Sequence, residues 1–585
     1  MSASKTWRGV ALVGVFFTLL ATTGLTGLAN AADEPRLIKP VNATKDDVNP
    51  GRTYSAPFLA VDPSNKKNIV GGFIEFRTRA CGLIRSTNGG ASWKVLDSQP
   101  DLKSYPYCLA NNSNIFHAPV AFGRDGALYL ATHAWDTPDS RNKVGVQVAK
   151  STDMGDHWTT VLARDARPTK DEAQENVRPI TGMIVDTKSG AQDIIYVTVR
   201  AGFPNTASPN SKIQQPWVLI SRDAGKTFEP PVIITGDYFK GAGITDKALS
   251  ARTTIPGTTT TTAVAGSLGA TPNNAANFGS AGNGQGLVMD KSGTLYYAWL
   301  TASANVTPSV PSAVLLSKST DKGKTWTTSE VRPPEYNNRQ NARMAWTPGG
   351  GANGTLHLVW EYTPTPTLNS YAEAEYVRST DGGKTWSEKV RLSDSDPKGF
   401  FGSYLPNLTV APNGRLDATW WDQRDDPGIR SNDVYYAYSN DDGKTWSKNY
   451  RITDQTVDRR FGVWGNNFDQ NSPPGMVSTD EFVMFAWDDT RFSRGDQANI
   501  QAGDPVAAGN GIGGGVQDIF VSAVQFKAIG AGTSKTAKII FAGVIGLFAV
   551  GLALTAVAMI SRKRSGGATP AQKPVKKAPT PATKI

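Results

Sequence analysis

The chain has 585 residues, with 61 Lys and Arg, 51 Asp and Glu, and two cysteines. One hydrophobic core does not extend over that length, so several domains or a repeat architecture are expected. Eleven of the basic residues lie in the first 31 residues or after residue 534, where no acidic residue occurs. The remainder holds 50 basic against 51 acidic residues, which excludes a nucleic-acid-binding domain because such a domain concentrates basic charge in its folded part.

The first residues predict a secretory signal peptide over residues 1–31. Lys5 and Arg8 precede an apolar run over residues 10–20, and the small-residue site Ala29-Asn30-Ala31 follows. That order of basic, apolar and small segments is typical of a cleaved signal peptide. An uncleaved membrane helix is the alternative, although the run is short for a membrane span. Residues 33–50 form an N-terminal segment before the main domain.

Residues 539–560 form an apolar run without a charge, long enough for a transmembrane helix. Arg562, Lys563 and Arg564 follow it directly, and positive charge collects on the cytoplasmic side. These features predict a type I single-pass protein of the cell membrane, with residues before the span outside. Residues 528–538 form a linker, and the basic residues 561–585 are expected to form a disordered cytoplasmic tail near anionic lipid.

Cys81 and Cys108 both lie in the predicted exterior part. In an oxidising compartment an even pair predicts a disulfide, here between the first two repeats of the chain. Two free thiols are the alternative.

An octapeptide with Ser, Asp, Gly and a final aromatic residue recurs through the exterior part. Its six copies start at Ser86, Ser151, Ser221, Ser319, Ser379 and Ser439. The pattern predicts a β-hairpin turn, since an Asp or Asn side chain accepts hydrogen bonds from its own turn and Gly supplies a positive φ. The aromatic side chain then packs under the loop. The acceptor positions are Asn88, Asp153, Asp223, Asp321, Asp381 and Asp441, and the aromatic positions are Trp93, Trp158, Phe228, Trp326, Trp386 and Trp446.

Each octapeptide follows a short alternating strand, and a further strand lies upstream of it. The upstream strands are expected at residues 68–73, 126–131, 193–199, 293–299, 354–360, 414–420 and 481–487. Each unit is therefore a four-stranded antiparallel sheet, which is one blade of a β-propeller. Seven upstream strands favour seven blades, with six as the alternative because the last unit, ending at residues 518–525, has no octapeptide. The predicted fold is an all-β propeller over residues 51–527 with a flexible insertion near 240–282.

Over about residues 50–527 the chain resembles the Asp-box (bacterial neuraminidase repeat) proteins of the sialidase-like superfamily. The resemblance implies that the octapeptides, or Asp-boxes, lie at the blade periphery, away from a ligand pocket. A retaining sialidase needs three arginines for the substrate carboxylate, a tyrosine nucleophile with a glutamate partner, and an acid/base aspartate. The residues offered for these roles are Arg178, Arg343, Tyr404, Glu361 and Asp136. The family's N-terminal Arg-Ile-Pro motif is absent, and the nearest string, Val177-Arg178-Pro179, falls in the third unit.

Charged residues also follow several of the upstream strands, often as an acid with an arginine two or three positions later. They are Glu75, Arg77, Arg200, Asp422, Arg424, Asp488 and Arg491. Two interpretations remain open: repeated salt bridges between blades, or a polar cup for an anionic or sugar ligand.

No cofactor or metal is expected. The four histidines, His117, His133, His157 and His357, lack metal-ligand spacing, and the four Gly-Lys-Thr strings lie inside octapeptides without a phosphate loop's first glycine. Two functions remain: a surface glycosidase of the sialidase type, and a non-catalytic propeller that binds a glycan or surface protein. A fold resemblance by itself does not decide between them.

Overall fold

The computed structural model describes seventeen stretches of the chain. They are residues 34–45, 53–76, 79–96, 107–108, 117–135, 144–167, 176–205, 208–236, 286–300, 312–335, 341–363, 372–397, 402–426, 431–459, 461, 472–492 and 517–526. Within these stretches, no helix has the length and apolar character that a membrane span requires. The predicted signal peptide, linker, transmembrane helix and tail lie outside the described residues, as does the predicted insertion.

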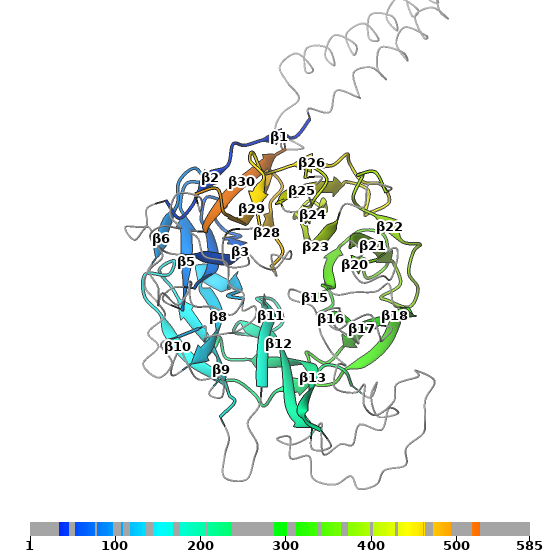
Figure 1. Cartoon of the computed structure of the whole chain (residues 1–585). Helices are drawn as coiled ribbons and strands as arrows, with labels where there is room; N and C mark the ends of the chain where they lie inside the picture. The colour runs from blue at the N-terminus through cyan, green and yellow to red at the C-terminus, as the bar shows by residue number, and fades with distance from the viewer. Residues whose placement is uncertain are drawn as a thin grey trace, which may run out of the picture. The chain divides into compact units, whose positions relative to one another are not determined.

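The described strands form seven antiparallel sheets arranged in a ring around a central axis (Figure 1). Blade 1 consists of β3 (Tyr54–Val61), β4 (Ile69–Glu75), β5 (Ala80–Ser86) and β6 (Lys94–Leu96). Blade 2 consists of β7 (Val120–Phe122), β8 (Leu128–Trp135), β9 (Val144–Ser151) and β10 (Thr159–Asp165). Blade 3 consists of β11 (Asn176–Asp186), β12 (Ile194–Asn205), β13 (Ser208–Ser221) and β14 (Val232–Ile233). Seven blades confirm the favoured prediction.

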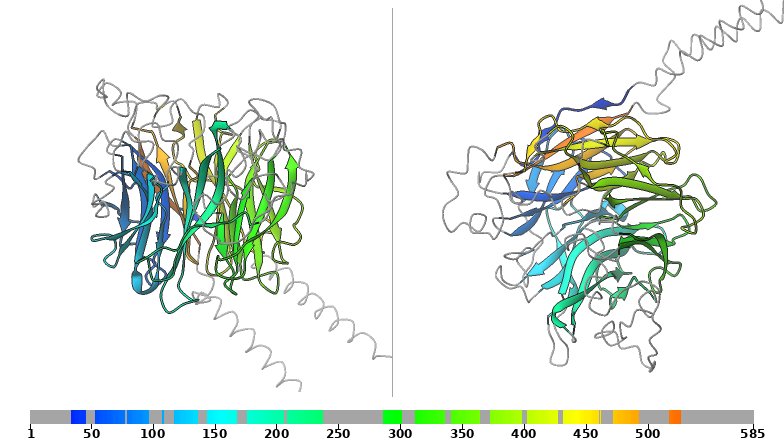
Figure 2. Two further views of the ribbon diagram at one scale, coloured as in Figure 1. Left: turned by 90° about the horizontal axis from the view of Figure 1, so that it is seen from below. Right: turned by 45° about the vertical axis from the view of Figure 1, so that its right-hand side comes forward.

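The remaining blades repeat the same order from the axis outward. Blade 4 consists of β15 (Leu287–Met289), β16 (Leu295–Leu300), β17 (Ser312–Ser319) and β18 (Thr327–Glu335). Blade 5 consists of β19 (Arg343–Thr347), β20 (Thr355–Tyr362), β21 (Glu373–Ser379) and β22 (Val390–Arg391). Blade 6 consists of β23 (Ser403–Val410), β24 (Leu416–Asp422), β25 (Ser431–Ser439) and β26 (Tyr450–Arg451), with β27 (Val457–Asp458) beside β25. Blade 7 is β28 (Gly475–Ser478), β29 (Phe482–Asp489) and β30 (Asp518–Gln525). Figure 2 shows from the side that the blade strands run between the two ends of the ring.

The N-terminal segment completes blade 7. β1 (Arg36–Leu37) and β2 (Val41–Asn42) both pair with β30, so the first strands of the chain close the ring at its last blade. The outer strand of this blade therefore does not follow β30 in the chain. Since an Asp-box joins the third strand of a blade to its outer strand, this connectivity explains why the seventh unit has no box.

The hydrophobic core is divided among the spaces between blades. The described residues form seven buried clusters, and each joins two consecutive blades, including blade 7 with blade 1. Trp135, Trp299, Trp360, Trp420 and Trp487, all at or near the ends of second strands, are among the largest fully buried side chains. Each blade is therefore covered on both faces, which accounts for the almost continuously buried second strands.

The Asp-boxes form the turns that the octapeptide predicts. In the fifth box, Asp381 Oδ1 accepts from the Thr385 N–H at 3.0 Å, and Oδ2 accepts from the Thr385 hydroxyl at 2.6 Å. Gly383 has φ +87°, and the residue before it, Gly382, has φ +73°. In the fourth box the Trp326 indole N–H donates to the Gly323 carbonyl at 3.1 Å, which holds the aromatic ring under its turn.

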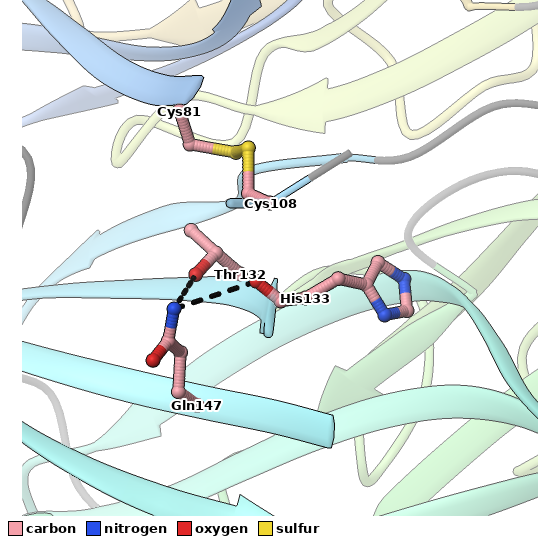
Figure 3. Close-up of a disulfide and its surroundings, with 5 residues drawn as sticks. All are labelled: Cys81, Cys108, Thr132, His133 and Gln147. Atoms are coloured by element: carbon pink, nitrogen blue, oxygen red, sulfur yellow. Dashed lines mark hydrogen bonds between the residues drawn. A yellow bond between two sulfur atoms is a disulfide. The ribbon is translucent and has the colours of Figure 1, made fainter. Parts of the chain in front are cut away.

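A disulfide joins the first two blades, as the cysteine count predicted. Cys81 lies on β5 and Cys108 precedes β7, with 5.8 Å between their Cα atoms. Both lie in the buried cluster between blades 1 and 2. Figure 3 shows the disulfide above the second strand of blade 2, where Gln147 donates to the Thr132 hydroxyl at 3.0 Å.

Candidate functional site

The two ends of the propeller carry different residues. At one end, called here the axial end, the inner strands begin and the second strands end, as the pairings Tyr54↔Glu75 and Ser403↔Asp422 show. The other end carries the Asp-boxes, since Ser439 of the last box pairs with Leu416 at the start of β24. The described residues among those predicted for catalysis or binding lie at or beside the axial end.

Neighbouring blades are joined at the axial end by side chains on second strands. The Glu361 carboxylate of blade 5 accepts from the backbone N–H of Leu405 in blade 6 at 2.9 Å. In the same way, Asp488 of blade 7 accepts from the Ala56 N–H of blade 1 at 3.1 Å. Leu405 and Ala56 have positive φ, +52° and +56°, and each precedes a proline at an irregularity of its inner strand. Glu361 and Asp488 are therefore committed to the blade interfaces.

Burial changes the ionisation of Asp488. Its carboxylate also accepts from the Ser55 hydroxyl at 2.7 Å, but burial outweighs these bonds and raises the pKa of Asp488 to about 7. Glu75, also buried, accepts from the Thr53 N–H at 3.1 Å within its own blade.

Arg343, at the start of the inner strand β19, is the exceptional charge of the axial end. Its side chain is 1% exposed, and none of its three guanidinium nitrogens has an acceptor among the described residues. Burial lowers the pKa of Arg343 to about 9, against the opposing influence of Tyr297 and Glu361. A buried cation without a hydrogen-bonded partner is costly, so this position is either strained or completed by a ligand.

Polar side chains from two other blades, His117 and Tyr297, lie close enough to Arg343 to interact with its charge. Burial, with the charges of Arg343 and His133, lowers the pKa of His117 to about 3. Burial also raises the pKa of Tyr297 to about 12, although Arg343 and Arg200 act in the opposite direction. The Tyr297 hydroxyl is 3.1 Å from the Thr181 hydroxyl. Arg343, His117, His133, Tyr297 and Arg200 are called the axial cluster below.

Tyr404, offered as the nucleophile, contacts an arginine of the same blade. Its hydroxyl accepts from Arg459 Nη1 at 2.5 Å, and its ring packs in the cluster between blades 6 and 7. The Arg459 guanidinium also lies 5.2 Å from the centre of this ring. Glu361 is bonded to Leu405 and to the Asn341 side chain.

Arg424 and Arg491 form salt bridges between blades. Arg424 lies 2.8 Å from Asp422 of its own blade and 2.5 Å from Asp394, which follows blade 5. Arg491 is 2.8 Å from both Asp489 and Asp454, which follows β26 of blade 6. The sequence spacing pairs Arg491 with Asp488, whereas the structure uses the neighbouring Asp489. These arginines therefore fit the salt-bridge interpretation of the repeated acid and arginine spacing.

Three predicted residues have no described side chain. Asp136 and Arg77 lie outside the described residues, and Arg178 lies on β11 with only its backbone described. Arg200 lies on β12 and is half-buried. Of the five residues proposed for catalysis, the structure brings Arg343 and Glu361 near each other, and Tyr404 lies beside Arg459. Within the described stretches, no group of three or more His, Cys, Asp or Glu side chains could hold a metal ion.

A comparison with known families identifies the repeat. The model of the BNR/Asp-box repeat matches residues 377–388, which contain the fifth octapeptide with the turn geometry described above. A sialidase from Bacteroides fragilis is 33% identical over 129 residues, a match that covers 18% of this chain and 23% of that protein. The fifth octapeptide is thus similar to the BNR/Asp-box repeat, and part of the chain is similar to a sialidase. It matches about a quarter of the length of the curated sialidase.

Solved structures similar to the chain match it at TM-scores below 0.5. A protein of unknown function from Dyadobacter fermentans has a TM-score of 0.43 at 13% identity, covering 85% of this chain and 100% of its own. The NanB sialidase of Streptococcus pneumoniae has a TM-score of 0.38 at 10% identity, and the match covers 77% of this chain and 94% of that chain. An α-L-arabinanase of Penicillium chrysogenum has a TM-score of 0.38 at 13% identity, and the match covers 66% of this chain and 94% of that chain.

Sequence reasoning missed the side chains of the Asp-box propeller that approach Arg343. His117 lies just before β7 in the string His117-Ala118-Pro119, and Tyr297 lies within β16. A weak signal exists for His117, because Ala56-Pro57 and Leu405-Pro406 show the same residue-proline step at the start of an inner strand. Tyr297 has no local signal, since its position is that of an ordinary buried strand residue.

Proposed function

We propose that this Asp-box propeller recognises acidic glycans outside the cell, with the ligand's anionic group on Arg343. The buried guanidinium without an acceptor among the described residues is the observation that carries the proposal. Guanidinium groups bind carboxylates through two parallel hydrogen bonds, so a carboxylate fits this position better than a neutral sugar. Because the Arg343 side chain is buried, we expect a ligand group to reach it only from the space around the ring's axis.

A sugar acid at the end of a glycan matches these requirements. Sialic acids and uronic acids both present a carboxylate on a ring that carries hydroxyl groups. The name of the matched Bacteroides protein, a sialidase, supports the first of these two ligands. The unpaired cation supports either one, and the experiment below has an arm for each.

Recognition without turnover is proposed ahead of hydrolysis because the sequence lacks the Arg-Ile-Pro motif of the sialidases. The proposed protein is therefore a glycan-binding propeller, and sialoside turnover is the outcome that would replace this proposal by an enzyme.

The proposal includes the cell-surface location that the signal peptide and the segment 539–560 predict from the sequence. β30 runs from the axial end to the Asp-box end, where Gln525 pairs with Phe482. Phe526 is held at that end by a hydrogen bond from its N–H to the Glu481 carbonyl, 2.8 Å, and by the Arg415 guanidinium at 3.8 Å from its ring. Phe526 thus lies at the end of the propeller opposite the axial cluster.

The test uses the exterior domain, residues 33–534, which contains every strand of the closed ring. It is applied to a glycan array with sialylated, uronic-acid and neutral glycans, and to a fluorogenic sialoside. We expect retention of acidic glycans, no retention of neutral ones and no turnover. The Arg343→Met variant is expected to lose retention. Equal retention of acidic and neutral glycans, or no retention at all, would reject the proposed recognition.

A further inference from the structure

His117 is a buried side chain whose ring nitrogens are not hydrogen-bonded within the described stretches. It is 0% exposed, and neither nitrogen has a partner among the described residues. Its ring lies against Phe58, at 5.1 Å between centroids and an interplanar angle of 52°. Buried imidazoles are normally hydrogen-bonded, so two unsatisfied nitrogens on one ring require an explanation.

The position of His117 places it opposite Arg343. His117 precedes the inner strand of blade 2, and Arg343 begins the inner strand of blade 5. Two blades separate them in one direction around the ring and three in the other. They nevertheless lie close enough for the charge of Arg343 to lower the pKa of His117. Both residues stand where an inner strand begins, and the inner strands surround the axis at this end of the ring (Figure 1), so the fold itself brings the two positions to one site.

The ionisation of His117 fixes what it can bind. Its pKa of about 3 means that the ring is neutral at physiological pH, with one N–H donor and one nitrogen acceptor. A neutral imidazole beside a cation does not attract a second negative charge. It complements a group that both donates and accepts, such as a hydroxyl or an amide.

We propose that His117 is a specificity-determining residue of the axial site. It hydrogen-bonds a hydroxyl or amide of the same ligand whose carboxylate binds Arg343. The ligand class is then a hydroxylated monoacid, a sugar acid with one negative charge at the axis, and not a phosphate or sulfate ester. This inference rests on the proposed function, because it assumes that Arg343 holds the ligand's acid group.

A packing role is the alternative for His117, since the ring contacts Phe58. The two roles differ in what a phenyl ring does at this position. Phenylalanine preserves an aromatic packing surface but has no donor or acceptor, whereas glutamine preserves a donor and an acceptor on a smaller side chain. Packing predicts a tolerated His117→Phe change, and ligand recognition predicts a tolerated His117→Gln change.

The experiment measures dissociation constants of the exterior domain by calorimetry for sialyllactose, a glucuronic-acid disaccharide, a sulfated disaccharide and lactose. His117→Phe is expected to weaken binding of the preferred sugar acid at least tenfold, and His117→Gln less than threefold. His157→Phe is the matched control, because His157 lies in the second Asp-box with its side chain 90% exposed. Unchanged melting temperatures show that each variant is folded.

The outcomes separate the two proposals. If wild type binds a sugar acid through Arg343 and His117→Phe binds equally well, the inference on His117 is wrong while the proposed function stands. The inference on His117 is also contradicted if wild type prefers the sulfated disaccharide. It is contradicted as well if the affinity of wild type, but not of His117→Gln, rises tenfold as the pH falls from 7 to 5. If wild type retains no acidic ligand, both proposals are wrong.

Discussion

The carboxylate of Glu361 accepts a hydrogen bond from the backbone N–H of Leu405, 44 residues later and in the next blade, at a distance of 2.9 Å. Leu405 has a positive φ, a conformation that costs energy for a residue with a bulky side chain. Asp488 and Ala56 repeat the arrangement where blade 7 meets blade 1. The same device therefore joins consecutive blades at the axial end, and it uses two carboxylates that the sequence offered for catalysis or binding.

The first prediction concerns this contact. Glu361→Ala removes the acceptor and leaves the buried Leu405 N–H without that hydrogen bond. We expect a loss of ~1–3 kcal/mol in the free energy of unfolding, measured by urea denaturation. Glu361→Gln keeps a carbonyl acceptor and is expected to lose less. An Ala variant as stable as the Gln variant would show that the contact does not stabilise the interface.

Asp488 predicts a pH dependence of stability. Its folded pKa is near 7 and its ordinary value is 3.8, so between these values the folded state binds more protons than the unfolded state. The stability contributed by this group is present below about pH 4 and is lost as the pH rises to 7, by ~1.4 kcal/mol for each pH unit. Asp488→Asn should remove that part of the dependence in melting curves from pH 4 to 8.

The control for this measurement is Glu388→Gln, because Glu388 is exposed. This variant should keep the wild-type pH profile. An Asp488→Asn profile that overlaps that of wild type across the range would mean that Asp488 does not titrate there.

The disulfide gives a third prediction. Cys81 and Cys108 are 27 residues apart in the chain, and closing a loop of that length in the unfolded state stabilises the folded state by ~3 kcal/mol. The double variant Cys81→Ala/Cys108→Ala should lower the melting temperature, and a reducing agent should lower that of wild type but not of the variant. A wild-type melting temperature insensitive to reductant would contradict this expectation.

The N-terminal strands give a fourth prediction. Ile38 N donates to the Ala523 carbonyl and Ala43 N to the Ile519 carbonyl, both at 2.8 Å, and the Thr44 hydroxyl donates to Asp518 at the same distance. Removal of residues 33–45 exposes the edge of β30 and opens the ring closure. We expect a cost of several kcal/mol and increased aggregation, measured by unfolding and light scattering. A truncated domain with wild-type stability would show that closure by β1 and β2 is dispensable.

The fold was largely predictable because its signals are local and repeated. Each box carries its turn chemistry within eight residues, and five of the seven second strands contain a buried tryptophan such as Trp360 or Trp420. β1 and β2 escaped prediction because strands of two residues have no periodicity. Their partner, β30, lies almost 500 residues away in the chain.

The candidate site was predictable only in part, for a geometric reason. Glu361 and Arg343 belong to one hairpin, so their proximity follows from the strand pairing. The approach of His117 to Arg343 depends on how closely seven blades pack around the axis, and no local sequence pattern specifies that distance. In the same way, the contact of Tyr404 with Arg459, 55 residues later, has no local sequence signal.

The last prediction sets stability against binding at Arg343. A buried charge without a hydrogen-bonded partner destabilises the free protein, and a hydrophobic side chain of similar length removes that cost. Arg343→Met should therefore raise the free energy of unfolding by at least about 1 kcal/mol while it abolishes retention of acidic glycans. Arg343→Lys keeps the charge but not the planar fork, and is expected to bind more weakly than wild type without the gain in stability. Calorimetric unfolding and glycan binding on the same samples decide the matter: a Met variant that is both less stable and fully competent in binding would mean that Arg343 supports the fold and takes no part in the site.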